Sequence, residues 1–245
     1  MRLGLAALGL AAMLSACATA PAGGVVANPK DPWEATNRKV FAFNDRLDLV
    51  VLKPLAEGYQ AVVPMPVRDA VGNFFSNLSD AWSSVNWLLQ GEVQRSLEQG
   101  ARFAWNSTLG VGGLFDVSST MGLDRRNQDF GQTLGTWGVG LGPYVVLPVL
   151  GPSSLRDVAA LPVNRAAFGT SFISDGTGRV ALAALEVVSL RASLLAAERI
   201  VSGIALDKYT FFRDAYLQRR GNQPDPDDDE GFEIVTPPAT PKPNP

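Results

Sequence analysis

Apolar side chains recur at helical spacing along most of the chain, which predicts a mainly α-helical fold. In the first half the pattern predicts helices over residues 31–53, 66–78, 80–89 and 92–106. The first helix is expected to begin at Asp31-Pro32-Trp33-Glu34, with Asp31 as its cap, and to end before Pro54. Its apolar stripe consists of Val40, Phe43, Leu47 and Val50 or Val51, and its polar side of Asn37, Asn44 and Asp48.

Two more helices are predicted toward the C-terminus. Residues 179–205 form a long helix with a wide apolar surface, and its charged residues argue against a membrane span: Glu186, Arg191, Glu198 and Arg199. Two interpretations stay open, because such a helix can line a protein core or face lipid at a membrane boundary. Residues 207–220 form the last helix.

The two ends of the chain differ from its body. Arg2 is followed by twelve residues without a polar side chain, which predicts a secretory signal too short to span a membrane. Leu14-Ser15-Ala16-Cys17 resembles a bacterial lipobox, so Cys17 is the predicted lipidation site; a cleavage site with a chance cysteine is the alternative. We predict a signal peptide over 1–16, a lipidated tether over 17–30, a helical domain over 31–220, and a disordered, acidic, Pro-rich tail over 221–245.

The segment from Gly110 to Gly151 lacks amphipathic periodicity and holds ten of the 24 glycines. Long irregular segments in compact domains are usually functional or disordered, and the apolar content of this one argues against disorder. Its glycines do not form a nucleotide-binding loop, because no Gly-Lys-Ser/Thr follows and Pro143 takes the last glycine position of a dinucleotide fingerprint. Close backbone packing and turns are the simpler explanation for them.

Composition and charge exclude several classes of function. There is no His, which removes Ser-His-Asp and Cys-His catalysis, and a single Cys leaves no internal disulfide or thiolate cluster. We therefore expect no metal and no cofactor. The net charge of −3 lies mostly in the tail, so the body has no basic excess for nucleic acid. Charged residues make up only 18% of the chain, which is low for a protein surrounded by water.

Several motifs, in order across about 31–220, resemble the VacJ/MlaA family of outer-membrane phospholipid-transport lipoproteins. They are Asp31-Pro32-Trp33-Glu34-Ala35-Thr36-Asn37-Arg38, Phe43-Asn44, Lys53-Pro54-Leu55-Ala56, Asn73-Phe74-Phe75-Ser76-Asn77-Leu78, Asn86-Trp87-Leu88-Leu89-Gln90-Gly91, Asn106-Ser107-Thr108-Leu109-Gly110, Asp129-Phe130-Gly131-Gln132-Thr133-Leu134-Gly135, Gly142-Pro143-Tyr144 and Gly151-Pro152-Ser153-Ser154-Leu155-Arg156-Asp157. Each is weak alone, but their order behind a lipobox is specific.

The resemblance implies a single helical, ring-like domain lying in the inner leaflet of the outer membrane, lipid-anchored on the periplasmic side. It implies a polar channel through which phospholipid leaves the outer leaflet, which maintains lipid asymmetry without an enzymatic step. The implied partners are phospholipid, a periplasmic lipid carrier protein, a trimeric outer-membrane porin and, indirectly, an inner-membrane ABC transporter.

The glycine-rich segment is the candidate channel wall, because small residues leave room for a headgroup: Gly112, Gly113, Gly135, Gly138, Gly140 and Gly142. Four arginines are candidates to attract phosphate: Arg102, Arg125, Arg126 and Arg156. Local ion pairs are the alternative role for these arginines, with Asp116, Asp124, Asp129 or Asp157 as partners.

Two other classes of protein compete with a transporter. A lipid-anchored periplasmic hydrolase needs a nucleophile and a base, but no Lys stands in a Ser-x-x-Lys string. A structural or adhesive surface lipoprotein needs no site at all. The wide apolar helices argue against a protein of that kind standing in water.

Overall fold

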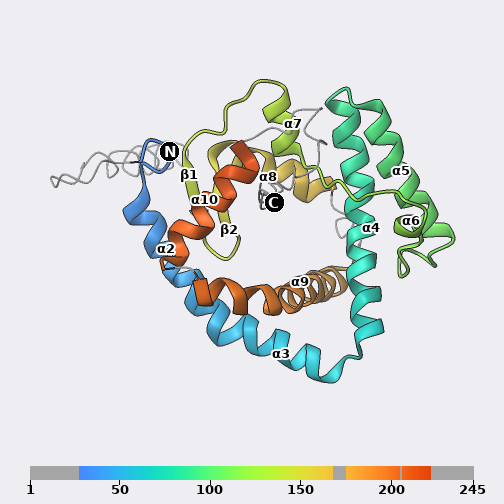
Figure 1. The fold of residues 1–245 in the computed structure, drawn as a ribbon, viewed down its shortest axis with the longest axis horizontal. Helices are drawn as coiled ribbons and strands as arrows, with labels where there is room; N and C mark the ends of the chain where they lie inside the picture. The colour runs from blue at the N-terminus through green and yellow to red at the C-terminus, as the bar shows by residue number, and fades with distance from the viewer. Residues whose placement is uncertain (1–27, 168–174, 205, 222–245) are drawn as a thin grey trace, which may run out of the picture.

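The computed structural model describes residues 28–167, 175–204 and 206–221, and its helices follow one another around a ring (Figure 1). The predicted signal peptide, Cys17 and the predicted tail beyond Gly221 lie outside the described residues. The prediction of a mainly helical fold is confirmed. The helices of the first half of the chain form the rim of the ring, and those of the last third lie on its inner side.

The first arc is α2 (Glu34–Leu47), a π-helix (Asp48–Leu52) and α3 (Lys53–Val62). The prediction that helix ends before Pro54 is wrong, because the π-turn places Pro54 in the first turn of α3, where its missing N–H costs little. Asp31 does not cap α2. Its carboxylate is buried and accepts hydrogen bonds from Asn37 Nδ2 at 2.8 Å and Tyr209 OH at 2.5 Å.

The second arc is a pair of packed helices, α4 (Met65–Leu89) and α5 (Val93–Thr108). The sequence predicted two helices, 66–78 and 80–89, where the structure has one continuous helix of 25 residues. Asp80 suggested a break but lies within α4, fully buried and ion-paired with Arg102 and Arg125. Gly91 makes the turn into α5 with a φ of +85°, a conformation that glycine adopts readily.

The segment from Gly110 to Gly151 is more ordered than predicted. It contains α6 (Val117–Thr120), α7 (Phe130–Thr136) and β1 (Tyr144–Leu147), which pairs antiparallel with β2 (Gly151–Ser154). A capping box begins α7: the Asp129 side chain accepts the Gln132 N–H, and the Gln132 side chain accepts the Asp129 N–H. These elements are too short for periodicity to reveal them.

The last arc closes the ring. It consists of α8 (Leu155–Ala167), which the sequence did not predict because Pro162 interrupts its pattern, α9 (Gly176–Ile204) and α10 (Lys208–Gly221). In the ring α9 packs along α3 and also contacts α4 (Figure 1). Tyr144 of β1 and Tyr209 of α10 share one small apolar cluster, which joins the hairpin to the C-terminal helix.

Burial in this ring is inverted relative to a water-soluble protein. Among the described residues, ten hydrophobic side chains are buried against nineteen polar or charged ones. Along α2 and the π-helix that follows it, the polar side faces inward, with Asn37 buried, while the apolar stripe faces outward, with Phe43 54% and Val50 72% exposed. Exposed apolar area on this scale marks an interface with lipid or protein.

Within the described residues one stretch, Gly176–Arg199 of α9, is long and apolar enough to cross a membrane by length and composition. The sequence argument against such a span was too strict, because an 18-residue window of this helix holds no more than two charges and has a mean hydropathy of 1.8. Only 11% of that window is buried. Most of the helix is therefore free to face lipid or the interior of the ring.

Candidate functional site

A cavity of about 820 Å³ lies between α3, α4 and α9. Half of the residues that line it come from α4, and the polar ones among them lie along one side of that helix: Arg68, Asp69, Asn73, Ser76 and Ser79. These positions recur every three or four residues, so they form a stripe along the helix. The opposite side of α4 is apolar, and Val67, Val85 and Leu88 are exposed there. This helix therefore separates a polar interior from an apolar exterior.

The facing wall of the cavity is α9, which contributes Glu186, Ser189 and Ser193 at similar spacing. Ion pairs hold α9 against the first arc of the ring. Arg191 donates to Asp48 at 2.6 Å and to Glu198 at 2.6 Å, and Glu198 also accepts from Lys53 Nζ at 3.0 Å. The side-chain amide of Gln60 in α3 donates to the Ala192 carbonyl at 2.8 Å, which fixes the third wall.

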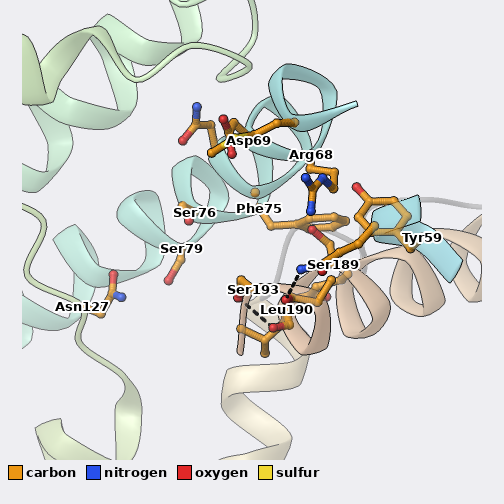
Figure 2. Close-up of a pocket in the computed structure, with 16 residues that line it drawn as sticks. Tyr59, Arg68, Asp69, Phe75, Ser76, Ser79, Asn127, Ser189, Leu190 and Ser193 are labelled. Carbon is orange, nitrogen blue, oxygen red and sulfur yellow. Dashed lines mark hydrogen bonds between the residues drawn. The ribbon is translucent and has the colours of Figure 1, made fainter. Parts of the chain in front are cut away.

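Two polar atoms in this wall have no partner. Arg68 Nε and Tyr59 OH are buried and make no hydrogen bond within the described residues. In Figure 2 both side chains point toward the same end of the cavity, with Ser189 of α9 beneath them. Buried polar atoms are normally satisfied, so a pair of unsatisfied donors in one cavity indicates a place for a ligand.

None of the predicted path residues lines this cavity. Arg102 on α5 is 0% exposed, and it donates to Asp80 of α4 at 3.3 Å and to both Asp116 oxygens at 3.0 Å. It also donates to the Leu123 carbonyl. The structure therefore places Arg102 in the ion-pair role that the sequence left open, with the predicted partner Asp116.

The ion-pair cluster of Arg102, Arg125, Asp80 and Asp116 shifts the pKa values of its two acids. Burial raises the pKa of Asp80, although the charges of Arg125 and Arg102 oppose that shift. Burial also acts to raise the pKa of Asp116, but hydrogen bonds from Ser119, Asn106 and Arg102 outweigh it and lower the pKa to about 2.

Arg156 is nearly buried at the start of α8. It donates to Asp157 at 3.2 Å and to the Arg220 carbonyl at 3.4 Å, so its surroundings match the predicted ion pair. Of the other two arginines, Arg125 pairs with Asp80 at 3.1 Å and with Asp116 at 3.3 Å. The backbone N–H of Arg126 donates to Gln99 Oε1.

The predicted glycines have differing surroundings. Gly113 is buried, and a Cβ there would lie 2.6 Å from Asn77 Nδ2, which indicates close packing. Gly112, Gly138 and Gly140 have open space, with φ of +70° at Gly112 and +90° at Gly138. Gly142 would place a Cβ 3.2 Å from Leu155, and Gly135 lies within α7. Their role as a channel wall stays a prediction.

The polar face of α4 was not among the path residues predicted from the sequence. A signal was available, because Asn73, Ser76 and Ser79 recur at helical spacing and Val67, Val71 and Phe74 fall on the opposite side of the same helix. The ring places these polar side chains inward, along the cavity.

The chain resembles known proteins over most of its length. Residues 29–223 match the family model described as MlaA lipoprotein. Proteins named "Intermembrane phospholipid transport system lipoprotein MlaA" in Shigella flexneri and Escherichia coli are each 34% identical over 224 residues, 89% of this chain and 88% of theirs. A structure solved under the heading "Structural basis for maintenance of bacterial outer membrane lipid asymmetry" is 36% identical, with a TM-score of 0.68 over 78% of this chain and 96% of that one. The chain therefore belongs to the MlaA lipoprotein family.

Proposed function

We propose that this protein removes phospholipid from the outer leaflet of the outer membrane and maintains lipid asymmetry. The observation that carries the proposal is the inverted ring, in which apolar side chains face outward and a polar cavity lies inside. The relatives named as intermembrane phospholipid transport lipoproteins support the same function.

The physical task is to move a headgroup without stripping it of polar contacts. A charged or zwitterionic group loses its solvation in hydrocarbon, at a cost of several kcal/mol or more. The polar stripe of α4 and the Ser189 and Ser193 hydroxyls of α9 offer replacement contacts. A cavity of about 820 Å³ is in the usual range for a small-molecule site, so it suits a headgroup while the acyl chains stay in lipid.

The exterior of the ring suits a position in the inner leaflet. Exposed apolar side chains on α2, α3 and α4 contribute roughly 25 cal/mol per Å² that leaves water. Lipidation of Cys17 would add a membrane anchor to this embedded surface. The handover of lipid to a periplasmic carrier, the attachment to a trimeric porin and the link to an inner-membrane ABC transporter belong to this proposal.

The test measures outer-leaflet phospholipid in a deletion strain that is complemented with variants. Ser76→Phe and Ser79→Phe place bulk in the cavity, and we expect them to behave like the deletion at normal protein abundance. Val85→Phe is the matched control, because Val85 lies on the exposed apolar side of the same helix. Normal asymmetry in the deletion strain itself would refute the function and favour a structural lipoprotein.

A further inference from the structure

The unpartnered donors of the cavity indicate what it binds. Five buried side-chain polar atoms lack a hydrogen-bond partner within the described residues, and two of them, Arg68 Nε and Tyr59 OH, line this one cavity. Among the described residues Arg68 makes no ion pair either. A buried N–H without an acceptor is costly, so an acceptor that reaches Arg68 Nε would complete the site.

The chemistry of these donors selects an anionic oxygen acceptor. A guanidinium has only donors, in a fork that matches two oxygens of a phosphate group, and the Tyr59 hydroxyl can donate to a third acceptor. Arg68 lies in the first turns of α4, and Met65, where this helix begins, lines the same cavity. The positive end of the helix dipole therefore adds to the attraction for phosphate.

The cavity also carries negative charge. Asp69 follows Arg68 on α4, and Glu186 faces them from α9, so the lining has one cation and two carboxylates. Arg165 on α8 lies outside the lining but interacts electrostatically with Glu186. A headgroup with a net negative charge is disfavoured by such a lining, whereas an ammonium group gains from the carboxylates.

We propose that the cavity selects zwitterionic phospholipid headgroups, with the phosphodiester on Arg68 and Tyr59 and the ammonium group at Asp69 and Glu186. This inference rests on the proposed function and names the substrate class of the same site. It assigns each half of the headgroup to a separate set of side chains, so variants can change affinity and selectivity independently.

The experiment compares binding of phosphatidylethanolamine and phosphatidylglycerol, with identical acyl chains, to the purified full-length lipoprotein in detergent. We expect the wild type to bind phosphatidylethanolamine roughly tenfold more tightly, which corresponds to about 1.4 kcal/mol. Arg68→Gln should weaken both lipids by roughly tenfold, and Tyr59→Phe should weaken both by less. Glu186→Gln should reduce the preference instead, because it removes a carboxylate from the proposed ammonium site.

Arg46→Gln is the control, since Arg46 is exposed near the end of α2 and lies outside the cavity. Thermal melting checks the fold of each variant, and Arg68→Lys replaces Arg68→Gln if the latter unfolds: it should keep the charge but weaken both lipids by losing the fork. Equal binding of the two lipids by the wild type, or unchanged binding in the Arg68 variants, overturns the headgroup assignment. Normal lipid asymmetry in the deletion strain would instead overturn the proposed function, so the two failures differ.

Discussion

Replacement of Arg102 by Leu tests whether this arginine serves the fold or the lipid path. The side chain is fully buried, and removing it leaves Asp80, also 0% exposed, without one of its two cationic partners. It also removes two hydrogen bonds to Asp116 and one to the Leu123 carbonyl. Breaking a buried ion pair from one side typically costs about 3–5 kcal/mol.

We therefore expect Arg102→Leu to lower the free energy of unfolding by roughly 3–5 kcal/mol, or the melting temperature by roughly 10 °C for a domain of this size. Unfolding in detergent, followed by circular dichroism, measures the effect. The double variant Arg102→Leu/Asp80→Leu should be less destabilised than the sum of the single variants, because it leaves no unpaired buried carboxylate at position 80.

The control for these variants is Arg46→Gln, which removes an exposed charge and should change the melting temperature by little. An Arg102→Leu protein that melts at the wild-type temperature but fails to restore lipid asymmetry would refute the structural role. That result would favour the lipid path, the other role that the sequence left open for Arg102.

Three further predictions follow from other residues. The pKa of Asp116 is lowered to about 2, so its carboxylate stabilises the fold above its unfolded pKa of about 4, and this contribution of about 2 kcal/mol is lost as the pH falls toward 2. In acid unfolding, the stability of Asp116→Asn should therefore fall less between about pH 5 and pH 2 than that of the wild type. If the glycine-rich segment forms the channel wall, Gly140→Leu abolishes lipid asymmetry at normal abundance, since open space surrounds Gly140; preserved asymmetry excludes the segment. A secreted version with Cys17→Ser should stay in the membrane fraction because its apolar exterior remains, and recovery as a soluble monomer contradicts an embedded ring.

Helix content and order could be predicted because apolar periodicity is a local property of the sequence. Boundaries depended on single residues whose role is decided by distant partners. Asp31 and Asp80 have the chemistry of helix caps, yet one binds Tyr209 and the other binds Arg102 and Arg125. Pro54 predicts a helix end, but a π-turn, which spacing does not reveal, carries the chain past it.

The candidate site was harder to predict than the fold because the orientation of each amphipathic helix depends on the surrounding medium. The apolar stripe that contains Phe43 and Val50 was identified correctly from the sequence. Whether this stripe faces the inside or the outside of the protein is set by the fold, and here it faces outward. In water such a stripe faces the core, whereas around a polar passage in lipid it faces outward. The polar side of α4 then becomes the inner wall, so residues such as Ser76 and Asn73, which the same pattern assigns to a solvent face, line the cavity. Resemblance to a membrane-embedded family therefore carries information that periodicity lacks, because it tells which of the two faces of each helix meets hydrocarbon.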